Sequence, residues 1–430
     1  MKILLPIIFA FLCIPSYSTE VEVIELHENK SLDQMVLDQI ENENEDIGFD
    51  DNLININEDD SNNNNENDSK ENKIIVDENN IEINENFWND VEIDYLNEIL
   101  VNVENIKSNF IQNEFNNFLF DLNLNYEIKK NRDIFYSIVN YFYSVGNISR
   151  AHSMIKSRDI ENDENEFFYN LIEMNYLLST FKLEEACNFK DQFNTNGKNK
   201  ENLIEKIEIF CLILQNKSSE AQLLNSIMLE TEINVDENFQ ELFLLLNNEN
   251  NVEGDKIFEF SENLNSELLF LYSAMARIAE LPLNENFLKV DPINMAIPII
   301  LNKSTPIDLR IKAANLSFTN QNISIDSLAA LYQSVDFNSN QLNNPESTLE
   351  QLKGKNDILM SFYFQLINIQ IFPKERLEVL ISFWDFAREN NLEHIAYSLT
   401  FNIIESIEIT SDYLKYSPQI AISYIHNKIT

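Results

Sequence analysis

Two cysteines are the residues of this chain whose type and spacing point most directly to chemistry. Cys13 lies in an apolar N-terminal run that we expect to be cleaved off, which leaves the pair Cys187 and Cys211. An even pair in an exported protein favours a disulfide. Their distances from the intervening turn differ by about five residues, or roughly 7 Å of helical rise. The pair therefore fits either a disulfide or two free buried thiols.

Other residue types that carry catalysis or metal binding form no recognisable motif. The four histidines have no metal-ligand spacing, and the sequence contains no glycine-rich phosphate loop, Gly-x-Ser-x-Gly or Cys-x-x-Cys. The Asp-rich stretches lack the spaced ligands and central glycine of a calcium loop. We therefore expect no catalytic residue, no metal and no cofactor, and a protein that is not an enzyme. The histidines are His27, His152, His394 and His426.

Three equally spaced alanines indicate a structural repeat. Ala151, Ala186 and Ala221 stand 35 residues apart, and the apolar positions around them recur in register. The apolar residues 12, 9 and 8 positions before each alanine lie on one face of a first helix. The alanine and the apolar residue three positions after it lie on one face of a second helix. The period is close to that of tetratricopeptide repeats, and the small alanines let two helices approach closely. The breaks between helices fall at Gly146-Asn147, Thr180-Phe181 and Asn216-Lys217.

Helical periodicity continues to the end of the chain, and no sustained two-residue alternation predicts a strand. Capping signals at Asp163 and Thr305 start two further helices. We predict an all-α fold of tetratricopeptide-like helix hairpins that form a superhelical array, an α-solenoid. The other helices are expected at 89–104, 108–122, 131–145, 148–157, 198–215, 218–231, 236–248, 266–281, 324–335, 355–371, 373–390, 392–407 and 410–427.

The regular period does not extend beyond three units, since Asn116 and Lys256 occupy the next alanine positions on either side. A cluster of prolines follows, which fits either a hinge between two arrays or irregular loops in one. We divide the folded part into a helical-repeat array with 35-residue units at 87–281 and a helical C-terminal half at 282–430. We favour one superhelix with a soft joint near 282–306. The prolines are Pro282, Pro292, Pro298 and Pro306.

The first 18 residues have the pattern of a signal peptide. Lys2 precedes an apolar run from Ile3 to Ile14, and small residues allow cleavage after Ser18. The run is too short to span a bilayer, and we expect no membrane insertion after its removal. We therefore expect export to the periplasm, with secretion as the alternative.

Residues 19–86 form an acidic, Asn-rich segment that we expect to be disordered, because it offers little apolar surface for burial. A short helix from Ser31 to Ile40, with Val36 on its apolar side, is the exception that the pattern allows. The composition of the segment fits either a solvated spacer or an acidic docking peptide. The net charge of −42 at pH 7 argues against nucleic acid and anionic membranes as partners.

The repeat core resembles an uncharacterised exported family of tetratricopeptide-like helical proteins from alphaproteobacteria, some of which carry the label "antifreeze". The resemblance would cover about residues 90–430. It implies a periplasmic protein of unknown role with no established active residues. It rests on Glu185-Ala186-Cys187, Ile209-Phe210-Cys211-Leu212 and Ala221-Gln222-Leu223-Leu224, with Asp308-Leu309-Arg310-Ile311-Lys312-Ala313-Ala314 and Leu328-Ala329-Ala330-Leu331-Tyr332 in the second half.

Three functions remain open from the sequence. The first is a non-catalytic scaffold that binds a protein or peptide, since stacked helix pairs form extended binding surfaces. Asn140, Asn175 and Phe210 stand where a basic clamp for a carboxylate would need Lys or Arg, so we expect a basic or amide-rich partner. The second is an accessory of a cell-envelope machine such as the flagellar motor. The third is a cell-wall hydrolase with two carboxylates in the joint at 282–306.

Overall fold

The computed structural model describes most of the chain after residue 90. The described residues are 36, 76–77, 80–81, 91–104, 109–125, 131–158, 160, 162–193, 198–231, 235–247, 258–406 and 411–429. The predicted signal peptide at 1–18 lies outside them, as does most of the acidic segment 19–86. Among the helices described, none has the length and apolar composition needed to cross a membrane.

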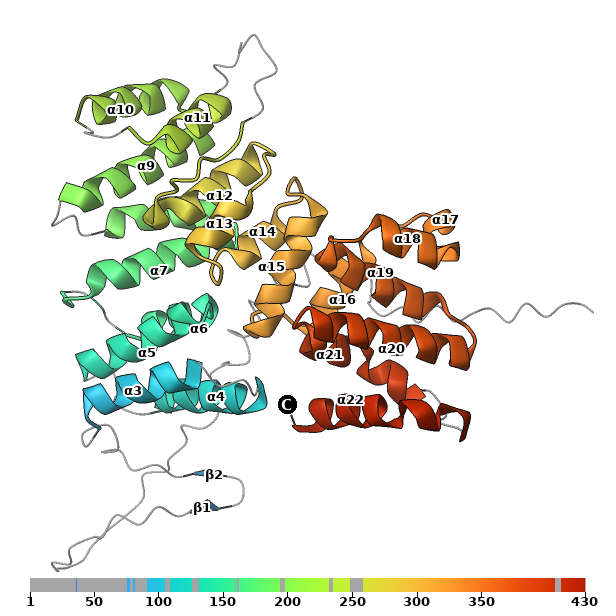
Figure 1. The fold of residues 1–430 in the computed structure, drawn as a ribbon. Helices are drawn as coiled ribbons and strands as arrows, with labels where there is room; N and C mark the ends of the chain where they lie inside the picture. The colour runs from blue at the N-terminus through green and yellow to red at the C-terminus, as the bar shows by residue number, and fades with distance from the viewer. Residues whose placement is uncertain are drawn as a thin grey trace, which may run out of the picture.

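Apart from one pair of two-residue strands, β1 (Val76–Asp77) and β2 (Asn80–Ile81), the regular structure in the described part is helical (Figure 1). The helices are α3 (Ile93–Glu104), α4 (Asn109–Asn125), α5 (Arg132–Ser144), α6 (Ile148–Lys156), α7 (Glu166–Ser179), α8 (Leu183–Phe189), α9 (Lys198–Leu214), α10 (Ser218–Thr231), α11 (Glu237–Leu246), α12 (Leu269–Ile278), α13 (Glu285–Val290), α14 (Ala296–Leu301), α15 (Ile307–Thr319), α16 (Ile325–Gln333), α17 (Ser339–Asn343), α18 (Pro345–Gln351), α19 (Asn356–Ile369), α20 (Pro373–Glu389), α21 (Glu393–Ser406) and α22 (Ser417–Ile429). Short 3₁₀ turns are η4 (Lys190–Gln192), η5 (Ser266–Leu268) and η6 (Ser411–Tyr416).

The all-helical prediction is confirmed, and most helix boundaries fall within a few residues of the expected ones. α10 spans the predicted 218–231. The helices that the sequence did not predict are α13, α14, α17 and α18, which have five to seven residues each. Helices of two turns or less show no apolar periodicity, because a stripe needs repeats at i+3, i+4 and i+7 to be recognised.

The first three hairpins share one turn geometry. The left-handed residue after the first helix is Gly146, Phe181 or Asn216, with φ of 81°, 63° and 59°. In each turn the next backbone N–H donates to the carbonyl five residues earlier at 2.8–2.9 Å, which closes a Schellman motif. The same turn recurs at Gln321 and Asn391, with φ of 62° and 58° and the same return bond at 2.8 Å. These two positions lie five and seven 35-residue periods after Gly146, whereas a further turn of the same geometry at Glu280, with φ of 53° and a return bond of 2.9 Å, lies outside this spacing.

The alanine column lies inside the hairpins. Ala151, Ala186 and Ala221 are 0%, 1% and 0% exposed, and they belong to α6, α8 and α10, the second helices of the three units. Each of these helices packs against the first helix of its own hairpin, α5, α7 or α9. A larger side chain at these positions would have to displace a neighbouring helix.

Buried apolar side chains form two clusters that do not divide at the proline-rich joint. The smaller cluster runs from Leu96 to Ile172. The larger one includes residues from Met174 to Ile420 and crosses the joint through α14, all of whose residues are buried. The core is therefore continuous through 282–306.

The chain does not stack only on its sequence neighbours. α12 packs against α7, although α8 to α11 lie between them in sequence. The turn between α15 and α16 also contacts the N-terminal helices: Gln321 Nε2 donates to Gln112 Oε1 at 3.1 Å, and Asn322 Nδ2 to the Val145 carbonyl at 3.4 Å. In Figure 1, α3 to α10 form one side, α12 to α15 the middle and α16 to α22 the other side.

One described residue of the acidic segment is part of this core. Val36 is helical, 1% exposed and a member of the larger cluster. Val36 belongs to the stretch from Ser31 to Ile40, where the apolar pattern allowed a short helix as the exception to the disorder expected for 19–86. The burial of its side chain removes apolar surface from water.

Candidate functional site

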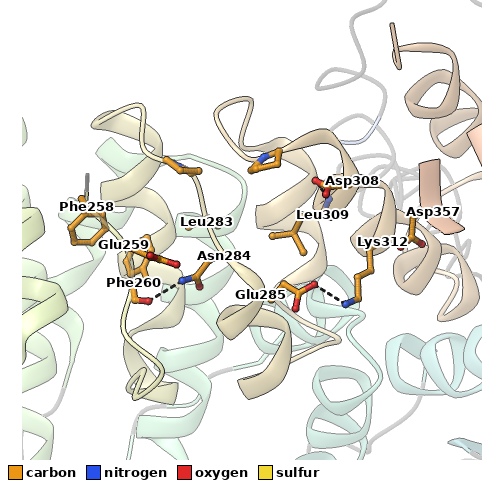
Figure 2. A pocket seen from close by; sticks show the side chains of 12 residues that line it. Phe258, Glu259, Phe260, Leu283, Asn284, Glu285, Asp308, Leu309, Lys312 and Asp357 are labelled. Carbon is orange, nitrogen blue, oxygen red and sulfur yellow. Dashed lines mark hydrogen bonds and ion pairs between the residues drawn. The ribbon is translucent and has the colours of Figure 1, made fainter. Parts of the chain in front are cut away.

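A cavity of about 430 Å³ opens where three helices begin (Figure 2). The first turns of α13, α15 and α19 meet there, beside the extended stretch 258–260. The lining residues are Phe258, Glu259, Phe260, Pro282, Leu283, Asn284, Glu285, Pro306, Asp308, Leu309, Lys312 and Asp357. Two of the clustered prolines are among them, so the cavity lies at the joint that the sequence singled out.

Asparagine side chains fix the loops that form the walls. Asn284 Nδ2 donates to the Phe260 carbonyl at 2.8 Å, while its Oδ1 accepts from the Asn286 N–H at 3.2 Å at the start of α13. The Leu283 N–H donates to Thr305 Oγ1 at 3.0 Å, which ties the strand-like entry of α13 to the entry of α15. These bonds satisfy backbone groups in segments that have no regular partner.

An aromatic group forms one wall. Phe260 is 3% exposed, and its ring lies edge-on to Phe258 and Phe287 with centroids 4.7 and 4.8 Å apart. Edge-to-face pairs at this separation are attractive beyond the area that they bury. Phe258 is only partly buried and lines the cavity, so it offers an apolar surface beside charged groups.

Carboxylates outnumber cations around the cavity. Glu285, Asp308 and Asp357 stand in the first turns of α13, α15 and α19, where the helix dipole favours negative charge. Glu259 adds a fourth carboxylate from the extended stretch. Of the described residues that line the cavity, Lys312 alone is cationic. Its Nζ lies 3.1 Å from Glu285 Oε1, and the two side chains are 44% and 60% exposed.

A buried relay holds one of these carboxylates. Tyr332 Oη donates to Asn315 Oδ1 at 2.7 Å, and Asn315 Nδ2 donates to Asp357 Oδ1 at 3.0 Å. Tyr332 and Asn315 are 0% and 4% exposed, so the orientation of the Asn315 amide is fixed. Burial raises the pKa of Asp357, whereas the hydrogen bond from Asn315 lowers it. The relay therefore orients Asp357 as a hydrogen-bond acceptor at the edge of the cavity (Figure 2).

The ion-pair geometry leaves negative charge uncompensated. Among the described residues, no lysine, arginine or histidine nitrogen lies within 4.0 Å of a carboxylate oxygen of Glu259, Asp308 or Asp357. Like charges that converge on a concave, partly apolar surface raise the local concentration of counter-ions. The site can therefore attract cationic groups, and its aromatic wall offers apolar surface at the end where Glu259 lies (Figure 2).

The residues singled out in the sequence lie elsewhere. Cys187 on α8 and Cys211 on α9 are joined by a disulfide with Cα atoms 5.6 Å apart. α8 ends two residues after Cys187 and η4 follows it before α9, so the link between the two helices is not a plain hairpin turn. Neither the cysteines nor the three repeat alanines line the cavity. Nothing in the sequence indicated that the acids of the cavity lie close together. They meet only because the first turns of α13, α15 and α19 pack side by side.

Metal ligands do not gather in the part of the chain that the structure describes: it contains no group of three or more His, Cys, Asp or Glu side chains suited to a metal ion. No family model matches the chain, and no curated protein or solved structure matches it either. The similarity to exported helical-repeat proteins therefore stays a hypothesis from the sequence.

Proposed function

We propose that this protein is a non-catalytic helical-repeat scaffold that acts outside the cytoplasm and binds a basic or amide-rich segment of a protein partner. The observation that carries the proposal is the surplus of carboxylates around the cavity between α13, α15 and α19. The proposed architecture is a tetratricopeptide-like α-solenoid. The same hairpin turn at Gly146, Phe181 and Asn216, each 35 residues after the one before, supports it.

The chemistry of the cavity favours a lysine or arginine side chain as the bound group. An ammonium or guanidinium at the end of the cavity where Asp308 and Asp357 lie would form charge-assisted hydrogen bonds, which are stronger than neutral ones (Figure 2). The aliphatic stem of the same side chain could lie on Leu309, which lies beside Asp308, since long basic side chains cover apolar surface while the charged end stays polar.

Two observations support an oxidising compartment outside the cytoplasm. The disulfide between Cys187 and Cys211 is of a kind that persists in the periplasm or after secretion. The N-terminal pattern that ends at Ser18 is typical of a signal peptide. An accessory role in a cell-envelope machine is the alternative use of the same scaffold, with the partner as part of that machine.

A cell-wall hydrolase is the second candidate, because the cavity lies in the joint where two carboxylates were considered. Asp357, whose pKa is raised by burial, is the group suited to donate a proton. Release of soluble fragments from purified peptidoglycan by the wild-type protein, lost in Asp357→Asn, would favour this candidate over the scaffold.

The scaffold is tested with two fluorescent octapeptides, one with three lysines and one with three glutamates. The double variant Asp308→Asn/Asp357→Asn removes two cavity carboxylates. Asp326→Asn/Glu346→Gln is the control, since these exposed acids also lie in first helix turns, of α16 and α18, but do not line the cavity. Both doubles reduce the net negative charge equally.

Fluorescence anisotropy should detect binding of the lysine peptide by the wild type and by the control double. The cavity double should bind it about tenfold or more weakly, since each charged hydrogen bond contributes about 1.5–3 kcal/mol. If both double variants lose the same affinity for the lysine peptide, the peptide responds only to the overall charge of the protein, and the proposal fails.

A further inference from the structure

Lys312 on α15 places a positive charge inside a site that otherwise carries negative ones. Its Nζ reaches across to Glu285 Oε1 on α13, 3.1 Å away (Figure 2). It also acts on the opposite wall, because its charge lowers the pKa of Asp357 against the effect of burial. One ammonium thus partly neutralises carboxylates of two different helices.

We infer that Lys312 is an internal ligand of the cavity, whose ammonium occupies the place that a primary ammonium of the partner takes on binding. The inference rests on the proposed function. It adds that the bound group is a lysine ammonium of the partner and that Lys312 competes with it. On binding, the partner's lysine ammonium would pair with Glu285, while the flexible side chain of Lys312 turns into water.

The exposure of the pair makes this exchange easy. The Lys312 and Glu285 side chains are 44% and 60% exposed, and ion pairs in contact with water are weak. An incoming ammonium at Glu285 replaces one solvated ion pair by another, and it also gains the attraction of Asp357, on which the charge of Lys312 acts in the free protein. Lys312 would therefore reduce the affinity for any basic partner and raise the selectivity against weakly charged ones.

A second feature of the site supports competition rather than a structural bridge. α13 is already joined to its surroundings by Asn284 and by the bond from Leu283 to Thr305. Phe287 and Leu288 of α13 are 0% and 8% exposed. The helix is therefore held without the Lys312–Glu285 pair, and removal of the pair should leave the fold in place.

The test compares Lys312→Met with Lys374→Met in the full chain. Methionine keeps an apolar stem of similar length and removes the charge. Lys374 is exposed in the first turn of α20, whereas Asp357 lies in the first turn of α19, so one helix of 14 residues separates them. That helix spans roughly 20 Å, about two screening lengths at 0.1 M salt. Both variants make the same change in net charge.

The probe is the fluorescent octapeptide with three lysines, titrated by anisotropy at about 0.1 M salt. Lys312→Met should lower the Kd about fivefold to tenfold, as expected for removal of one like charge close to the ligand. Lys374→Met should change it less than about twofold. Thermal melting followed by circular dichroism should give unchanged curves for both variants.

The failures of the two proposals are distinguishable. If the wild type binds the lysine peptide in the cavity and Lys312→Met binds it no more tightly than Lys374→Met, the inference is overturned and the proposed function stands. If neither the wild type nor Lys312→Met binds it, both are overturned. Binding that is seen only in Lys312→Met would support the inference directly.

Discussion

Gly146 occupies a hairpin turn whose backbone the α15–α16 turn approaches closely, so Gly146→Ala should destabilise the fold more than a change to alanine in a turn without this contact. Its φ of 81° is left-handed, as in the turns at Phe181 and Asn216. Those residues show that a side chain can be accommodated by the turn itself. At Gly146, however, an added Cβ would overlap the Asn322 amide and Ile293 Cγ2.

The expected loss has three parts. The left-handed conformation costs alanine about 1–2 kcal/mol. Displacement of Asn322 and Ile293 is an overpacking that costs about 1–3 kcal/mol. Asn322 would also lose its hydrogen bond to the Val145 carbonyl at 3.4 Å, a contribution of about 0.5–1 kcal/mol for a long bond. The free energy of unfolding should therefore fall by about 2.5–6 kcal/mol.

Urea denaturation followed by far-ultraviolet circular dichroism measures this loss, with Asn216→Ala as the control. Asn216 has the same turn geometry with φ of 59°, so its substitution should cost only about 1 kcal/mol of backbone strain. If the two variants shift the unfolding midpoint equally, the contact between the α5–α6 turn and the α15–α16 turn does not contribute as described.

Three further outcomes are expected. Cys211→Ser, which breaks the bridge to Cys187 24 residues away, should lower the free energy of unfolding by about 3 kcal/mol, and thiol titration of the unreduced, unfolded wild type should find no free thiol. Burial lowers the pKa of His394 below its usual 6.5, so the unfolded chain takes up the proton first as the pH falls and stability is lost below about pH 6.5. The drop in melting temperature between about pH 7.5 and about pH 5.5 should then be smaller in His394→Gln than in the wild type, and an equal drop would refute this. Ala186→Leu should cost about 1–3 kcal/mol by overpacking, whereas Asn188→Leu, at an exposed position of the same helix, should melt like the wild type.

Long helices with a one-sided apolar stripe could be read directly from the sequence. The hairpins around Ala151, Ala186 and Ala221 follow from local periodicity, because a helix that buries one face must repeat apolar residues at i+3 and i+4. The cysteine pair could be narrowed to two alternatives but not decided. The distance between Cys187 and Cys211 depends on the link between α8 and α9, which includes the short turn η4. A turn of this length has no apolar pattern by which the sequence could predict it.

The candidate site could not be predicted, because its parts carry no shared local pattern. Glu285, Asp308 and Asp357 are each ordinary first-turn acids, and three separate helix starts bring them together. The return of α12 to α7, and the contact of the turn at Gln321 with α4, depend on shape complementarity between distant surfaces. Such contacts are selected by side-chain packing, which a helical period does not encode.

The sequence by itself therefore determined the longer helices and the three hairpins around the alanines, since the apolar stripe of a helix repeats within a few turns. Only the tertiary structure decided that α12 returns to α7, that Val36 of the acidic segment enters the core, and that four carboxylates and one lysine line the same cavity. The physical reason is that burial and electrostatic fields are sums over neighbours in space, and those neighbours are far apart along the chain.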